Sequence, residues 1–140
     1  MKTKVLVLKG GDSSEREISL KSAINTVEAL QLAGFEVSEL DIKGTNDQSL
    51  KHACGLADVL FPVLHGEGGE DGVLQQKLED WGIAFIGSGS SASKTCINKQ
   101  LTRDAAQKAS IVIAAGAVVD IDSFTVSELT KKPYVLKPIV

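Results

Sequence analysis

Short apolar runs alternate along this chain with segments whose apolar residues recur at helical spacing. The four runs that are short enough to be strands are Val5–Leu8, Phe35–Ile42, Val59–Val63 and Ile83–Ile86. The helical segments between them are residues 20–30, 47–53 and 73–81. The pattern predicts the order βαβαβαβ. Such alternation is typical of an α/β fold in which helices flank an open, mostly parallel sheet, here of about four strands, through right-handed crossovers.

Polar residues and glycines mark the ends of the predicted helices. We expect Ser19 to cap the first helix and Asn46 the second, because short polar side chains accept hydrogen bonds from the free N–H groups of a first turn. Glycine favours the backbone conformation in which many helices end. Gly34, Gly55 and Gly82 therefore mark the expected ends of the three helices.

The pattern changes near Ser90. Residues 90–96 and 99–108 have helical character, and Asn98 is the expected cap of the second of these helices. Residues 114–119 favour an extended segment. These features predict linker helices that lead into a different structural region.

The last eight residues, 133–140, are predicted to form a strand that ends on apolar residues. Natural termini are more often polar and frayed, so we expect the sheet partners of this strand to lie in a segment that this chain lacks. The expected organisation is an amino-terminal α/β domain over residues 1–89, followed over residues 90–140 by linker helices and the beginning of a second, truncated domain.

Composition excludes several classes of protein. A chain of 140 residues with a net charge of −3 lacks the clustered excess of Lys and Arg that nucleic-acid binding requires. No apolar stretch is long enough to span a bilayer, and the first residues do not resemble a signal peptide, so we expect a cytoplasmic protein. Cys54 and Cys96 lack the spacing of a metal site or a redox motif, and we expect both to be packing residues.

Candidate chemistry lies directly after the first and third predicted strands. The first strand continues into Gly10–Glu17, and the third continues into Leu64–Gly72. Both segments combine glycines with acidic residues, and the second also contains His65. Open α/β sheets bind ligands at the carboxyl ends of their strands. The two segments therefore predict one site shared between neighbouring strands.

Each candidate also has an ordinary structural explanation. Glu15 can complement the positive end of a helix dipole, and Glu17 can form a capping box with Ser14. His65 can be a core residue with one satisfied hydrogen bond. Glu70 and Asp71 are best explained as caps of the helix that begins near Gly72. The composition of His65, Glu70 and Asp71 also permits a metal site, but we expect none.

Two lysines are candidates in the second half of the chain. Lys99 begins a predicted helix, where a cation opposes the dipole, although a solvated surface lysine is the default explanation. Lys137 lies among the apolar residues of the last predicted strand, and lysine is rarely buried without a partner. The turn at Gly87–Ser91 is too generic to indicate an anion site.

Several motifs together resemble the amino-terminal part of the D-alanine–D-alanine ligases. They occur in the family's order, and they are Gly10-Gly11-x-Ser13-Ser14-Glu15-Arg16-Glu17-Ile18-Ser19, Phe61–Gly66, Gly69–Gly72, Ile86–Gly89, Asn98-Lys99 and Val135–Pro138. The family belongs to the ATP-grasp superfamily, whose catalytic region continues beyond the length of this chain. The resemblance therefore implies a pre-ATP-grasp domain, the start of an ATP-grasp domain, and an incomplete chain that is inactive alone.

The resemblance also implies roles for particular residues. It implies that Glu15 is catalytic and binds the ammonium group of the first D-alanine, with His65 beside the same substrate site. Lys99 and Lys137 would bind the ATP phosphates. The complete enzyme would use ATP and Mg²⁺, with the metal ligands outside this chain. It would form an acyl phosphate and then the D-alanyl-D-alanine dipeptide for peptidoglycan, in the cytoplasm and as a homodimer.

Two other classes of α/β module remain as alternatives. A receiver domain has this size and a Lys-Pro pair after its last strand, as at Lys137-Pro138, but it needs a phosphate-accepting aspartate where this chain has His65. A dinucleotide-binding module needs G-x-G-x-x-G in its first turn, and the turn at Gly10–Glu15 lacks it.

Overall fold

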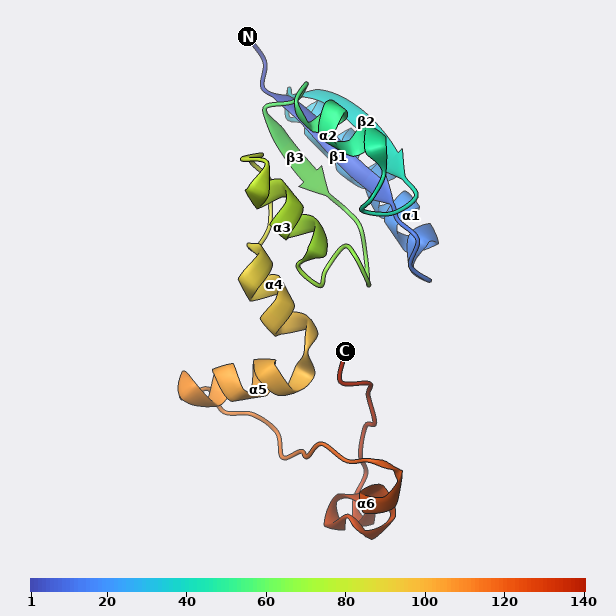
Figure 1. Cartoon of the computed structure of the whole chain (residues 1–140), viewed down its shortest axis with the longest axis vertical. Helices are drawn as coiled ribbons and strands as arrows, with labels where there is room; N and C mark the ends of the chain where they lie inside the picture. Colours follow the sequence, from blue (N-terminus) through green and yellow to red (C-terminus); the bar gives the residue numbers. More distant parts are fainter. The chain divides into compact units, whose positions relative to one another are not determined.

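The centre of the fold is a parallel sheet of three strands in the order β2-β1-β3. The structure is a computed structural model that describes residues 1–140, apart from the side chains of Thr125 and Leu129. It divides into two compact units, Met1–Lys94 and Thr95–Val140. The strands are β1 (Lys4–Gly10), β2 (Glu36–Ile42) and β3 (Val59–Pro62), and all belong to the first unit (Figure 1).

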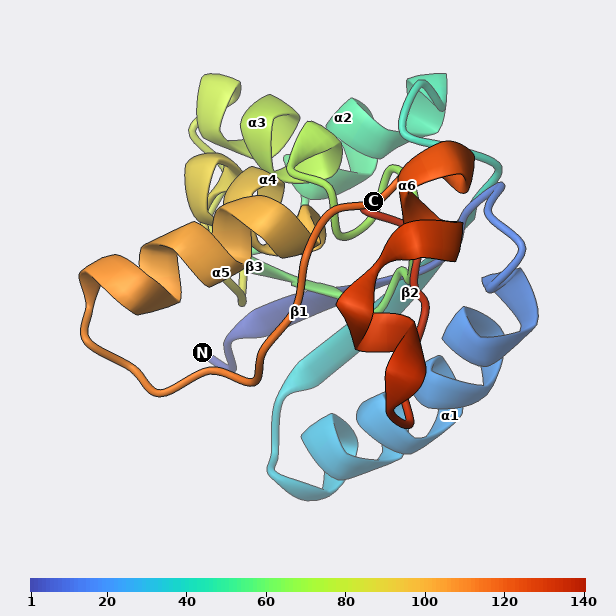
Figure 2. The same ribbon diagram turned by 90° about the horizontal axis from the view of Figure 1, so that it is seen from below.

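Helices cover both faces of this sheet. Figure 2 shows α1 (Arg16–Leu32) on one side of the sheet, with α2 (Gln48–Cys54) and α3 (Val73–Asp80) on the other. Successive residues of a strand point to opposite faces. In β1, Leu6 and Leu8 accordingly pack with residues of α2 and α3, whereas Val7 packs with Ala23 of α1. The predicted α/β fold with a parallel sheet is confirmed.

The fourth predicted strand is wrong as an element. Residues 83–86 form one isolated parallel bridge, between Phe85 and Leu60. The backbone of Leu60 makes two hydrogen bonds with this segment, donating to Ala84 O at 2.9 Å and accepting from Ile86 N at 2.9 Å. Gly82 and Gly87 bound the segment with positive φ angles of 66° and 129°, so the chain turns away before a longer ladder can form.

Two of the predicted amino-terminal caps are also wrong. The cap position of α1 is Glu15, and Ser19 lies inside the helix, where its buried Oγ accepts a hydrogen bond from Gly10 N at 2.9 Å. The predicted capping box between Ser14 and Glu17 does not form, because Glu15 occupies the cap position. In α2 the cap is Asp47 rather than Asn46, and its side chain accepts from Ser49 N.

The predicted end of α1 is confirmed. Gly34 has a φ of 91° and follows the C-cap residue Ala33. Its N–H donates to Gln31 O, and the next N–H, of Phe35, donates to Leu30 O. These bonds satisfy the last carbonyl groups of the helix in the arrangement that glycine favours at this position.

The second unit contains helices and irregular segments. Its elements are α5 (Lys99–Lys108), α6 (Ile121–Val126) and the 3₁₀ helix η1 (Glu128–Lys131), and α4 (Ser90–Ile97) leads into it from the first unit. Asn98 caps α5 as predicted, accepting from Gln100 N and Leu101 N. Residues 133–140 form no strand, so that prediction is wrong for this structure, and Lys137 lies in an irregular exposed segment.

The two cysteines differ in their surroundings. Cys54 is fully buried as predicted, and burial raises the pKa of its thiol. Cys96 is exposed on α4, so the expectation of a packing role is wrong there. Among the described residues, no helix combines the length and the apolar character that a bilayer span requires.

Candidate functional site

The turn between β1 and α1 presents Glu15 at the edge of the sheet. Gly10 and Gly11 have positive φ angles of 92° and 88°, which let the chain leave β1 sharply and begin α1 within a few residues. Glu15 is half-buried, and its side chain makes no capping hydrogen bond with α1. Its carboxylate therefore does not cap the helix that it precedes.

The loop between β3 and α3 is closed by its own acidic side chains. Asp71 accepts from Gly68 N at 2.8 Å and from Val73 N, in the first turn of α3, at 2.9 Å, although Gly72 rather than Asp71 occupies the N-cap position. Glu70 instead accepts from Gly66 N at 2.8 Å, so the prediction that Glu70 caps the helix is wrong. The two carboxylates fold the glycine-rich segment back on itself.

His65 lies at the base of this loop and is about one-third exposed. Its Nδ1 is 3.8 Å from Glu70 Oε1, and its Nε2 is 3.4 Å from Ser22 Oγ of α1. The ring therefore lies between a carboxylate of its own loop and a hydroxyl of the helix that follows Glu15. Polar contacts on both ring nitrogens orient the imidazole.

The two loops meet through Ser13. Its Oγ donates to His65 O at 2.7 Å and accepts from Glu15 N at 3.2 Å. Gly66 lies so close that an added Cβ atom would be 2.8 Å from Glu15 Oε2. Glu15 and His65, which are fifty residues apart in sequence, thus lie on adjoining loops at the carboxyl end of the sheet, as the sequence predicts for a shared site.

A hollow opens between these loops and the loop that follows β2. Its lining combines glycine backbone with polar and apolar residues, namely Gly11, Asp12, Ile42, Gly44, Thr45, Leu64, His65, Glu67, Gly68 and Gly69. Lys77 of α3 donates to Thr45 O at 2.8 Å and to Asn46 Oδ1 at 2.6 Å. These two bonds hold the loop that follows β2 against α3. Loops from all three strands therefore contribute to one edge of the sheet.

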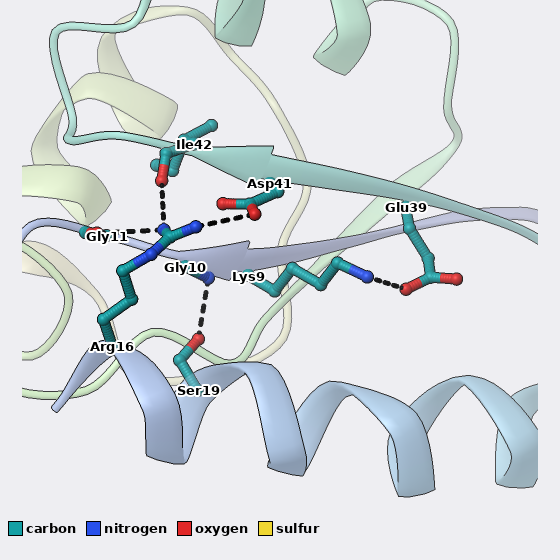
Figure 3. A network of polar contacts seen from close by, with 8 residues as sticks. All are labelled: Lys9, Gly10, Gly11, Arg16, Ser19, Glu39, Asp41 and Ile42. Atoms are coloured by element: carbon teal, nitrogen blue, oxygen red, sulfur yellow. Dashed lines mark hydrogen bonds and ion pairs between the residues drawn. The ribbon is translucent and has the colours of Figure 1, made fainter.

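Arg16 is the residue of this region that the sequence analysis did not single out. Its guanidinium donates to Gly11 O and Ile42 O, each at 3.1 Å, and to Asp41 Oδ2 at 2.7 Å (Figure 3). The hydrogen bond from Arg16 holds the pKa of the Asp41 carboxyl below its usual value, and the same bond raises the pKa of Arg16. The available signal was an arginine directly after Glu15, five residues beyond Gly11.

The acidic residues of the loops do not assemble a metal site. Within the part of the chain that the structure describes, no group of three or more His, Cys, Asp and Glu side chains is arranged to hold a metal ion. Glu70 and Asp71 instead use their oxygens on backbone N–H groups of their own loop.

Lys99 and Lys137 both belong to the second unit. Lys99 is the first residue of α5, and its backbone N–H donates to Ile139 O at 2.8 Å. The segment that contains Lys137 therefore runs beside the start of α5. Both lysine side chains are exposed, which leaves both ammonium groups accessible to an anion.

Comparison with known proteins gives the same family for sequence and for fold. A family model described as the D-ala D-ala ligase N-terminus matches residues 42–88. The D-alanine–D-alanine ligase of Gluconobacter oxydans is 40% identical over 139 residues, which are 97% of this chain and 45% of that protein. The corresponding ligase of Beijerinckia indica is 41% identical and is covered to 43%. The chain thus spans less than half the length of these curated relatives.

Solved structures agree with these matches. The D-alanine–D-alanine ligase of Bacillus anthracis complexed with ATP has a TM-score of 0.72 at 26% identity, covering 81% of this chain and 39% of that chain. The ligase of Aeromonas hydrophila has the same TM-score at 25% identity, covering 91% and 56%. The VanG D-Ala:D-Ser ligase of Enterococcus faecalis has a TM-score of 0.68 at 25% identity, covering 82% and 44%. In sequence and in fold, this chain is similar to the amino-terminal portion of D-alanine–D-alanine ligases.

Proposed function

We propose that this chain forms the amino-terminal part of an ATP-dependent ligase that joins two D-alanine molecules, and that it contributes the binding site for the ammonium group of the first. The observation that supports this most directly is the meeting of the Glu15 turn with the His65 loop. Ser13 bonds both loops, and Glu15 keeps a carboxylate that its own helix does not use. A fixed carboxylate beside an imidazole suits a primary ammonium group.

Glu15 acts in this proposal by holding the substrate. An ammonium ion bound to the carboxylate fixes one end of the amino acid, so that the substrate's own carboxylate is presented to the ATP phosphate. His65 orients the same site through Ser22 and Glu70 on its two ring nitrogens. The names of the ligases compared above share D-alanine as a substrate, whereas one of them names D-serine as its second substrate. The first D-alanine is therefore the substrate that we assign to this chain.

Phosphate contacts belong to the second unit in this proposal. Lys99 and Lys137 are exposed cations on segments joined by the bond between Lys99 N and Ile139 O. Lysine binds phosphate as a point charge, so both side chains are suited to the oxygens of ATP. Mg²⁺, the completed ATP-grasp domain, the homodimer and the cytoplasmic location belong to the complete ligase in the same proposal.

The test is Glu15→Gln in the intact ligase that contains this chain. The change keeps size and shape but removes the charge opposite the ammonium group. Loss of one charge-assisted hydrogen bond costs about 1.5–3 kcal/mol, so we expect the KM for the first D-alanine to rise roughly tenfold to a hundredfold or somewhat more. The KM for ATP should stay within about twofold, because Glu15 does not contact the nucleotide in this proposal.

Glu17→Gln is the matched control. Glu17 is an exposed acid in the first turn of the same helix, so its neutralisation removes a comparable helix-dipole interaction without touching the proposed site. Both kinetic constants should be unchanged in this variant. If Glu15→Gln left the D-alanine kinetics within about twofold of the parent enzyme, Glu15 would be a helix-dipole residue and the proposal would be wrong.

A further inference from the structure

Arg16 links three backbone segments at the edge of the sheet. Its Nη1 donates to Gly11 O in the turn after β1 and to Ile42 O at the end of β2, and its Nη2 donates to Asp41 Oδ2 on β2. Figure 3 shows the guanidinium lying between the first turn of α1 and the two strand ends. We use the name Arg16 clamp for this guanidinium and its partners Gly11, Asp41 and Ile42.

The clamp leaves no space for a side chain in the turn beneath it. A Cβ atom at Gly10 would lie 2.3 Å from Arg16 Nη1 and 2.2 Å from Asp41 Oδ1, both far inside contact distance. Gly10 also has a φ of 92°, which disfavours other residues. The absence of a side chain at Gly10 is therefore what lets the guanidinium reach the strand ends.

Two further bonds extend the clamp into the sheet and the helix. Gly11 N donates to Ile42 O at 2.8 Å, so the same carbonyl accepts from both the turn and the guanidinium. Gly10 N donates to the buried Ser19 Oγ of α1 at 2.9 Å. The start of α1 is thus bonded to β1 and to β2 at once, and its position is fixed in more than one direction.

Glu15 directly precedes Arg16 and has no capping bond of its own. The position of its carboxylate therefore depends on the backbone of the turn that the clamp holds. An exposed ion pair alone contributes little to stability. Two of the three acceptors here are backbone carbonyls from different segments, however, and the fork of an arginine can reach several acceptors at fixed angles, which lysine cannot. The arrangement suits positioning better than general stabilisation.

We propose that Arg16 is a positioning residue that sets the location of the Glu15 carboxylate by tying the β1–α1 turn to the end of β2. This rests on the proposed function of Glu15 as the ammonium-binding group of the first D-alanine. Arg16 does not contact the substrate in this proposal. It acts through Glu15 alone, and that restriction makes the proposal testable with a double-mutant cycle.

The experiment compares Arg16→Met, Arg16→Lys, Glu15→Gln and the double variant Glu15→Gln/Arg16→Met in the intact ligase. We expect Arg16→Met to raise the KM for the first D-alanine about tenfold while the KM for ATP stays within about twofold, because small displacements of a positioning group have large kinetic effects. Arg16→Lys should recover part of the loss. In the Glu15→Gln background, Arg16→Met should have no further effect on the KM for D-alanine.

Lys9→Met is the matched control. Lys9 pairs with Glu39 across the same two strands but away from the turn (Figure 3), so its removal tests whether any cation linking β1 to β2 has this effect. We expect unchanged kinetics. Thermal unfolding of each variant checks folding, and Asp41→Asn, which removes only the charged partner of the clamp, gives a milder change in the same direction if Arg16→Met does not fold.

The outcomes separate this proposal from the one on which it rests. If Glu15→Gln leaves D-alanine kinetics unchanged, the proposed function is wrong. If Glu15→Gln raises the KM but Arg16→Met does not, the positioning role of Arg16 is wrong while the role of Glu15 stands. Additive effects in the double variant also overturn the proposal, because they show that Arg16 acts independently of Glu15.

Discussion

In Met1–Lys94, apolar side chains of the sheet and its helices are buried against one another, whereas in Thr95–Val140 none of the described residues is buried. Tyr134, Val135 and Leu136 illustrate the difference, since they are 54%, 79% and 64% exposed. Apolar burial is the main favourable term in folding. Apolar burial therefore stabilises the first unit, whereas it contributes little to the stability of the second unit.

The candidate residues of the first unit are held by more hydrogen bonds than the candidate lysines of the second unit. Glu15 and His65 lie on loops that Ser13 joins to each other, and Arg16 ties the first loop to the end of β2 while Asp71 closes the second loop. Lys99 and Lys137 lie on segments that are joined by a backbone hydrogen bond from Lys99 N to Ile139 O. We therefore expect the proposed amino-acid site to be more nearly formed in this chain than the proposed phosphate contacts.

The difference between the two units should be largest in amide hydrogen exchange. Amides of β1 lie in a buried central strand bonded on both sides, and we expect them to exchange more than about a thousandfold more slowly than amides of residues 111–119, which are in neither helix nor strand. Mass spectrometry of peptides from this chain measures both, with the urea-unfolded chain as the reference for intrinsic rates. Equal protection in the two units would contradict the comparison.

The next largest difference should be in the free energy of unfolding that is lost when a leucine of each unit is replaced by alanine. Leu60 of β3 is fully buried, so Leu60→Ala should lower the free energy of unfolding by about 2–5 kcal/mol. Leu136→Ala removes the same atoms from a residue that is 64% exposed, and we expect a change within about 0.5 kcal/mol. Urea unfolding followed by circular dichroism provides both values. A similar loss in the two variants would show that the second unit has a core of its own.

The elements that the sequence predicted are those whose signal is local. The strands β1, β2 and β3 and the helices α1 and α3 follow from periodicity within each segment, and the end of α1 follows from Gly34. These features depend on neighbours in the chain. A pattern of apolar positions therefore predicts them without knowledge of the rest of the fold.

Several of the features that were missed depend on contacts with residues outside their own segment. Ser19 was predicted as a cap, but it lies inside α1 because Gly10 N needs its hydroxyl. Residues 133–140 have the composition of a strand, yet a strand forms only where another strand pairs with it, and here Ile139 bonds to the start of a helix instead. Arg16 was missed because two of its partners, Asp41 and Ile42, lie on the neighbouring strand.

The KM values for ATP and for D-alanine should respond differently to substitutions in the two units. In the intact ligase, Lys137→Met should raise the KM for ATP roughly tenfold or more, because it removes the charged donor that we propose to bind phosphate, while the KM for D-alanine stays within about twofold. This is the reverse of the expectation for Glu15→Gln. Lys132→Met, at another exposed lysine of the second unit, is the control and should change neither constant. A rise in the KM for D-alanine alone would reverse our assignment of the units.

The smallest expected effect is a pH dependence that belongs to the first unit. The hydrogen bond from Arg16 lowers the pKa of Asp41 in the folded chain. A carboxyl group with a lowered folded pKa stabilises the fold above its unfolded pKa of about 4, and this contribution is lost as the pH falls through the folded value. Asp41→Asn should therefore be less stable than the parent chain at neutral pH, and the difference should shrink on acidification below about pH 4.

Urea unfolding of the parent chain and of Asp41→Asn between pH 7 and pH 2 measures this difference. Because the two side chains of the pair are still 25% and 38% exposed, added salt should weaken the effect at neutral pH. Repeating the series in an Arg16→Met background isolates the cause. Without the guanidinium, Asp41→Asn should produce a smaller pH-dependent difference, because only the weaker effects of the Lys43 and Lys9 charges then lower the pKa of Asp41. A difference that stayed constant with pH, or one that persisted undiminished without Arg16, would mean that the Arg16 clamp does not hold the end of β2 through Asp41.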